Sequence, residues 1–103
     1  MEKKIALRVD DLDNVATIFA NGVTAGMEVE VRDKKGNLDP VTVNADIPYG
    51  HKIAVTDIPA GAHIMKYGES IGEAETDIRR GDYVHVHNMK ALRGRGDLGE
   101  AKE

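Results

Sequence analysis

The fold of this chain is indicated by the stretch Ile58-Pro59-Ala60-Gly61-Ala62-His63-Ile64, which has the form aliphatic-x-x-Gly-x-x-aliphatic. Residues 23–29 and 78–84 have the same form. The central glycine permits a left-handed turn, and the flanking aliphatic residues can anchor that turn in a core before a strand begins. In the copies at 58–64 and 78–84 an aspartate, Asp57 or Asp77, precedes the isoleucine. The repeat predicts a β domain built on recurring glycine turns.

Short apolar segments, most of them four to six residues long, lie between the glycines and prolines. Residues 27–32 alternate apolar and polar side chains, as half-buried strands do. The polar turn 33–37 follows, and 41–43 is expected to return as the second strand of a hairpin. Asn14 is a suitable N-cap for a single helical turn over 15–19, but no window sustains helical periodicity for ten residues. We predict a mostly β fold of many short strands, with candidates at 5–9, 15–19, 27–32, 41–43, 53–55, 62–66 and 83–87.

The composition excludes several classes of function. The 103 residues make one domain's worth of chain, with 14 Lys and Arg against 18 Asp and Glu and a net charge of −4. This acidic balance argues against generic nucleic-acid binding, which needs a basic surface. Cysteine is absent, which excludes thiol catalysis, disulfides and cysteine-ligated metals. No apolar run is long enough to cross a membrane, and no apolar stretch of the kind found in signal peptides follows the first lysines, so we expect a cytoplasmic protein.

The end of the chain differs in composition from the rest. Residues 90–103 are rich in glycine and charge, whereas 1–89 carry the apolar segments. We therefore expect a β domain over 1–89 and a flexible tail over 90–103. Arg93 and Arg95 in the tail are candidate partner-binding residues, because guanidinium groups pair well with carboxylate or phosphate.

The segment that offers most chemistry is Tyr83-Val84-His85-Val86-His87-Asn88. If it is a strand, the two valines face the core and the two histidines share the opposite face. Two imidazoles on one face can ligate a metal or hold an anion, although a usual metal site needs a third group. His51 is the best third imidazole and His63 a weaker one. The competing interpretation is that His85 and His87 are simply exposed residues of a surface strand.

Two polar segments add candidates. His51 and Lys52 follow the turn Pro48-Tyr49-Gly50, where they can bind a carboxylate, with Lys52 as the charge and His51 as donor or base. Residues 66–72 are expected to form a polar loop whose two glycines can offer backbone N–H groups to an anion. This loop has neither the Walker pattern nor a dinucleotide fingerprint.

Four motifs in this order resemble one known family: 13–16 (Asp-Asn-Val-Ala), 50–54 (Gly-His-Lys-Ile-Ala), 66–72 (Lys-Tyr-Gly-x-x-Ile-Gly) and 81–88 (Gly-x-x-Val-His-x-His-Asn). They resemble the SAF-type module of the altronate and galactarate dehydratases over about residues 5–98. In that family the module is the N-terminal part of a long enzyme or a separate small subunit. The resemblance implies a SAF-type β-clip fold, with the chain acting as the small subunit.

The resemblance also implies a hydro-lyase that converts a sugar acid into a 2-keto-3-deoxy acid, working with a large dehydratase subunit and a divalent metal such as iron held mainly on that subunit. A related branch eliminates sulfite from sulfolactate, and a non-catalytic sugar-acid-binding or regulatory module is the other alternative. Self-association through exposed strand edges stays open. The candidate residues are His51, His85 and His87 for catalysis, His85 and His87 for metal, and Lys52, Lys66 and Asn88 for substrate. Metal ligation, proton transfer and carboxylate binding all remain open for the histidines.

Overall fold

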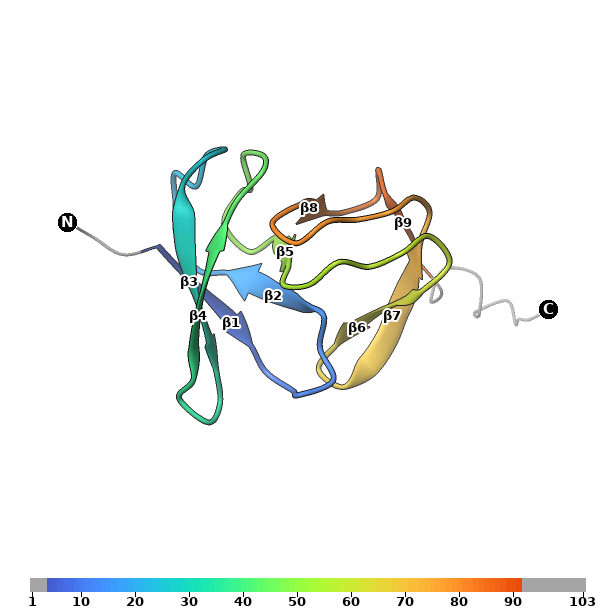
Figure 1. Cartoon of the computed structure of the whole chain (residues 1–103), viewed down its shortest axis with the longest axis horizontal. Helices are drawn as coiled ribbons and strands as arrows, with labels where there is room; N and C mark the ends of the chain where they lie inside the picture. The colour runs from blue at the N-terminus through green and yellow to red at the C-terminus, as the bar shows by residue number, and fades with distance from the viewer. Residues whose placement is uncertain (1–3, 92–103) are drawn as a thin grey trace.

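Short strands joined by glycine turns make up the part of the chain that the computed structural model describes, residues 4–91. These residues contain no helix, and hence none that could span a bilayer. The expectation of a mostly β fold is confirmed (Figure 1). The strands are β1 (Lys4–Arg8), β2 (Val15–Ile18), β3 (Glu28–Asp33), β4 (Leu38–Thr42), β5 (Lys52–Ala54), β6 (His63–Lys66), β7 (Glu69–Ala74), β8 (Tyr83–Val84) and β9 (Met89–Ala91).

Within residues 4–91 the strands form two sheets. A curled sheet has the order β4-β3-β1-β2-β5-β8, and a smaller one has the order β6-β7-β9. All pairs are antiparallel except β1 with β3, which run parallel. In Figure 1, β3 and β4 stand at the left of the molecule, whereas β6, β7 and β9 stand at the right. The expected boundary between 89 and 90 falls inside β9, and residues 92–103, with Arg93 and Arg95, lie outside the described residues.

The glycine turn within residues 58–64 is a repeated structural unit. In each copy the first residue of a four-residue turn accepts a hydrogen bond from the fourth, with a glycine of positive φ third. This is the geometry of a type II turn. The three copies found in the sequence are confirmed, and the structure adds a fourth at 47–53. The four glycines have φ of 91° (Gly26), 85° (Gly50), 88° (Gly61) and 96° (Gly81).

The four turn copies lie in two pairs, and each pair is joined by a β-bridge. Val23 bridges Ile47, and Ile58 bridges Ile78, each in antiparallel fashion. The aspartate ahead of one turn caps the opposite turn rather than its own. Three such caps join Asp46 to the amide of Ala25 (3.0 Å), Asp57 to that of Arg80 (2.9 Å) and Asp77 to that of Ala60 (2.9 Å). The position ahead of Val23 is Gly22, which has no carboxylate to offer, so the copy at 23–29 supplies no such cap to its opposite turn.

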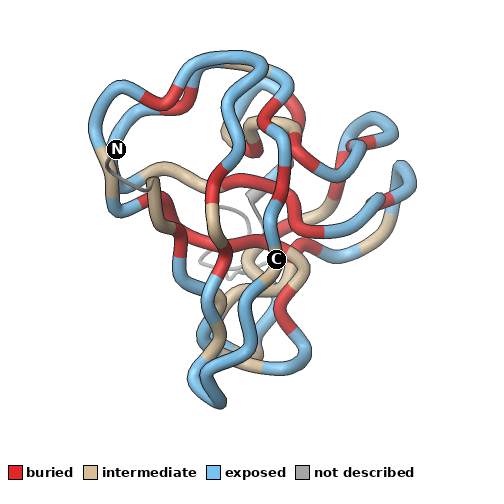
Figure 2. The backbone as a smooth tube through the Cα atoms, turned by 60° about the vertical axis from the view of Figure 1, so that its left-hand side comes forward, coloured by how far each residue is buried: buried red, intermediate tan, exposed pale blue. Residues whose placement is uncertain are grey.

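Two hydrophobic cores share strands. Along β2 and β5 successive side chains enter different cores, because strand side chains alternate faces. Figure 2 shows the buried positions interspersed with exposed ones along the chain. Core A consists of Ala6, Ala16, Ile18, Val23, Val29, Val31, Val41, Val43, Ile47, Ile53 and Val55. Core B consists of Val15, Ala54, Ile58, Ile64, Ala74, Ile78 and Val84.

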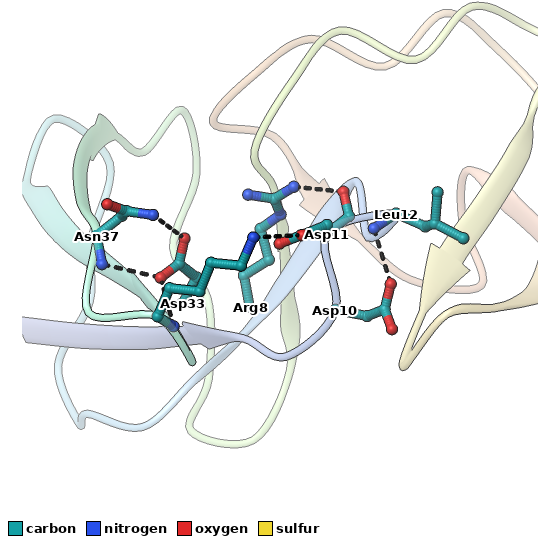
Figure 3. Close-up of polar contacts among 7 residues, drawn as sticks. Arg8, Asp10, Asp11, Leu12, Asp33 and Asn37 are labelled. Atoms are coloured by element: carbon teal, nitrogen blue, oxygen red, sulfur yellow. Dashed lines mark hydrogen bonds and ion pairs between the residues drawn. The ribbon is translucent and has the colours of Figure 1, made fainter.

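The hairpin expected at 33–37 is confirmed between β3 and β4. Asp33 closes the turn, because its carboxylate accepts bonds from the backbone of Lys35 (3.0 Å) and from the backbone and side chain of Asn37 (2.8 and 2.9 Å). Figure 3 shows Asp33 facing Asn37, with Arg8 reaching the backbone carbonyl of Asp11 across a 2.6 Å hydrogen bond. An ion pair of 3.0 Å from Lys35 to Asp11 ties the hairpin to the loop that follows β1.

Two expectations about neighbouring segments are wrong. Residues 66–72 are not a loop, because β6 and β7 form a hairpin through Tyr67 and Gly68, both at positive φ (58° and 78°), as a two-residue hairpin turn needs. Nor does Asn14 cap a helical turn, because 15–18 form β2. The Asn14 side chain instead docks the backbone of β6. Its Oδ1 accepts from the amide of Met65 (2.7 Å), and its Nδ2 donates to the carbonyl of His63 (2.9 Å).

Candidate functional site

Strand pairing brings distant candidate residues together. His51 directly precedes β5, and β5 pairs with β8 so that Lys52 lies opposite Val84 and Ile53 opposite Tyr83. The histidines that follow β8 therefore come close to the turn that carries His51. We call His51, Lys52, Lys66, His85 and His87 the basic cluster.

The strand expected over 83–87 ends at Val84, so the argument from alternating faces is wrong. Residues 85–88 form a tight turn in which the backbone N–H of Asn88 donates to the backbone carbonyl of His85 (3.0 Å). Val86 is 70% exposed rather than buried in the core. The cause is the buried Asn88 amide, which takes backbone groups that a strand would use: its Oδ1 accepts from the N–H of His85 (3.0 Å), and its Nδ2 donates to the carbonyl of Tyr83 (2.9 Å). Asn88 thus shapes the turn that carries both histidines.

Tyr83 lies at the centre of the imidazoles, although it is not among the candidate residues predicted from the sequence. Its hydroxyl is 2.7 Å from Nδ1 of His51. Its ring stacks on His85, with centroids 5.6 Å apart and planes 14° apart, and meets His87 edge-on at 5.4 Å. The rings of His51 and His85 are 4.9 Å apart. The available signal in the sequence for Tyr83 was its position two residues before His85 and four before His87. Its contact with His51, however, depends on the pairing of β5 and β8.

The basic cluster is coupled electrostatically. Partial burial lowers the pKa of His85, and the neighbouring His51, Lys52 and His87 lower it further. Burial also lowers the pKa of Lys52, with a second contribution from the charge of Lys66. Each charged neighbour that contributes to these two shifts is itself basic. A cationic side chain destabilised by its neighbours is relieved when an anion binds among them. The cluster is therefore suited to an anionic ligand.

Other predicted residues have different surroundings. The Nδ1 of His63, on β6, lies 2.7 Å from the hydroxyl of Ser70 on β7. Lys66, at the end of β6, places its ammonium 4.9 Å from the ring centre of Tyr67 and also lies close enough to Lys52 to lower its pKa.

The donor set of this chain does not fit a complete metal centre. Among residues 4–91, no three histidine, aspartate or glutamate side chains come together so that they could hold a metal ion. Two imidazoles alone leave a usual site one ligand short. We therefore derive no chemical step through a metal on this chain.

Comparison with known proteins places the chain in a family. Residues 4–92 match the model of the altronate/galactarate dehydratase SAF domain. The chain belongs to this family. This SAF chain is 42% identical over 84 residues to altronate dehydratase of Escherichia coli K12, an alignment that covers 82% of the chain and 16% of the relative. It is 40% identical over 79 residues to galactarate dehydratase (L-threo-forming) of the same organism, covering 76% and 14%.

A third relative has a different length. The SAF chain is 37% identical over 83 residues to the (2R)-sulfolactate sulfo-lyase subunit alpha of Chromohalobacter salexigens, covering 79% of this chain and 87% of the relative. The chain thus spans less than a fifth of the two dehydratases but most of the sulfo-lyase subunit. In the first case the SAF domain is a small part of a long protein, and in the second it makes up nearly a whole subunit.

Proposed function

We propose that this chain is the small subunit of a hydro-lyase that dehydrates a sugar acid, in complex with a larger catalytic subunit. The observation that carries the proposal is the basic cluster, where Lys52 and Lys66 stand near a pair of imidazoles 4.9 Å apart. The match to the sulfo-lyase subunit alpha, 87% of which the alignment covers, supports the part of the proposal that concerns a separate subunit.

The proposed reaction needs few groups from this chain. A base removes the proton from the carbon next to the carboxylate, and the hydroxyl on the following carbon leaves with a proton as water. The resulting enol becomes the 2-keto-3-deoxy acid. Lys52 and Lys66 bind the substrate carboxylate, and His85 accepts the proton, since its lowered pKa keeps the imidazole neutral and able to act as a base. Asn88 positions His85 by holding the turn. A divalent metal held by the large subunit would stabilise the enolate charge.

A sulfolactate sulfo-lyase is the second candidate, favoured by the 87% coverage of its subunit alpha. The same cluster could take the proton next to the carboxylate, while sulfite rather than water departs from the neighbouring carbon. The two candidates differ in leaving group, so product analysis separates them.

The test starts from the tagged chain purified from its native extract with whatever large chain accompanies it. The complex is assayed for 2-keto acid formation from D-altronate and galactarate, and for sulfite release from (2R)-sulfolactate. We expect His85→Gln to lower kcat by about 10²- to 10⁴-fold, as loss of a general base does. We expect Lys52→Met mainly to raise KM. His63→Gln is the matched control, because His63 bonds Ser70 rather than the cluster.

The outcomes separate the proposals. Unchanged kinetics in both His85→Gln and Lys52→Met, with the complex intact, would contradict any role of the cluster in turnover. An increase in KM in both variants without loss of kcat would favour a non-catalytic sugar-acid-binding module.

A further inference from the structure

We propose that Tyr83 is a positioning residue that fixes His51 in the tautomer with its proton on Nε2. In this tautomer Nε2 of His51 can donate a hydrogen bond, and His85 acts as the base. The proposal rests on the proposed function, because it assigns parts to two imidazoles within the same cluster. It adds a residue that neither the motifs nor the relatives' names single out. Its physical basis is the hydrogen bond between the hydroxyl of half-buried Tyr83 and Nδ1 of His51.

Tyr83 is held in place from two sides. Its ring packs against core A, and its backbone pairs with Ile53 of β5. Its carbonyl also accepts a hydrogen bond from Asn88 (2.9 Å). The hydroxyl therefore projects from a fixed ring rather than from a mobile side chain, and it lies 2.7 Å from Nδ1 of His51.

The chemistry of the two groups sets the direction of this bond. A phenol ionises near pH 10 and so carries its proton at neutral pH, whereas the unprotonated nitrogen of a neutral imidazole is the more basic acceptor. Nδ1 of His51 therefore accepts from the Tyr83 hydroxyl. A neutral imidazole that accepts at Nδ1 carries its proton at Nε2, because the hydrogen bond at one nitrogen selects the tautomer.

The neighbouring imidazole differs in environment. The ring of His85 lies 4.9 Å from that of His51 and stacks flat against Tyr83, so its contact with the phenol is through the ring face. It receives no tautomer-selecting bond from the Tyr83 hydroxyl, which is directed at His51. One tyrosine thus makes two adjacent imidazoles unequal. His51 can donate from Nε2 to a substrate oxygen, and His85 is left to take the proton.

The first experiment measures tautomers on the whole 103-residue chain alone. Ring-nitrogen NMR shifts of His51 are recorded at a pH where the histidines are neutral, for the wild type and for Tyr83→Phe, which keeps the ring and removes only the hydroxyl. We expect His51 of the wild type to be in the Nε2–H form and Tyr83→Phe to shift it toward a mixture of tautomers. Tyr49→Phe is the control, because it removes a hydroxyl from an exposed tyrosine two residues before His51. Superimposable far-UV circular dichroism spectra of the three proteins verify that the fold is kept.

Two results would overturn the assignment: a wild-type His51 with its proton on Nδ1, or ring-nitrogen shifts that Tyr83→Phe leaves unchanged.

The second experiment uses the complex with its large subunit. There we expect Tyr83→Phe to lower kcat by about 10- to 100-fold with little change in KM, as loss of a partner that orients a histidine does. If the tautomer shifts as expected but kcat is unchanged, the catalytic division of roles is overturned. If His85→Gln also leaves kcat unchanged, the proposed function itself fails.

Discussion

His85 shows how neighbours set the behaviour of one side chain. Its pKa lies below the ordinary histidine value of 6.5, because partial burial and the nearby basic groups all disfavour the imidazolium. The unfolded chain therefore binds a proton at a higher pH than the folded one. By linkage, the free energy of unfolding contributed by His85 falls as the pH drops from about 6.5 toward the folded pKa.

The first prediction concerns the source of that shift. Lys52→Met should raise the pKa of His85 toward its ordinary value, since it removes one of the cations that disfavour the imidazolium. An NMR titration of the imidazole of His85 measures the change. Lys34→Met, at an exposed position in the β3–β4 turn, is the matched control and should leave the titration unaltered. An identical His85 titration in wild type and Lys52→Met would contradict the coupling.

The second prediction separates backbone strain from steric overlap at two equivalent turns. Gly61 and Gly81 have similar φ, 88° and 96°, so alanine at either position meets the same left-handed penalty of about 1–2 kcal/mol. A Cβ at Gly61 would enter open space, whereas one at Gly81 would overlap the carbonyl oxygen of Thr42. Gly81→Ala should therefore lower the free energy of unfolding clearly more than Gly61→Ala. Equal losses in urea titrations would show that the contact with Thr42 relaxes freely.

At the scale of elements, side chains of loop residues decide where strands stop and which segments dock. Asn88 ends β8 after two residues, and Asn14 joins the start of β2 to β6 through a pair of bonds to Met65 and another to His63. Asparagine can do this because its amide carries both a donor and an acceptor, as a peptide group does. Strand propensity alone does not reveal where a side-chain amide takes the place of a backbone hydrogen-bond partner. For this reason the predicted helical turn over 15–19 and the predicted strand over 83–87 were wrong.

The third prediction tests the docking by Asn14. Asn14→Ala leaves the amide of Met65 without its 2.7 Å acceptor and should lower the free energy of unfolding by about 1–3 kcal/mol. Asn14→Asp keeps an acceptor for Met65 but replaces the donor to the carbonyl of His63 with a second oxygen, so it should also lower the free energy of unfolding. Hydrogen exchange at the Met65 amide should accelerate in Asn14→Ala and remain slow in Asn14→Asp. Slow exchange in both variants would contradict the assigned role.

At the scale of the whole molecule, the two cores are not independent, because β5 sends Ile53 into core A and Ala54 into core B. β2 divides its residues in the same way. Neither core can lose its strands without exposing the other, so the described part of the chain should unfold as one cooperative unit.

The fourth prediction follows from this sharing. Ile47→Val in core A and Ile64→Val in core B each remove one methylene from a fully buried side chain. Each should lower the free energy of unfolding by about 0.5–1.5 kcal/mol. Both should shift the same single transition, whether followed by far-UV circular dichroism or by tyrosine fluorescence. Two separate transitions, each moved by only one of the substitutions, would contradict the coupling of the cores.

The sequence alone determined the features that depend on local chemistry. The spacing of glycine and aliphatic residues specified the turns, because few residues other than glycine tolerate the left-handed backbone. Short apolar segments indicated a mostly β fold, and the motifs indicated the family. The tertiary structure decided what depends on distant partners. It paired β5 with β8, so that Tyr83 meets His51, and it directed each capping aspartate to the opposite turn. These contacts join residues about 17–32 positions apart, and local propensity carries no information about which distant backbone will supply the partner.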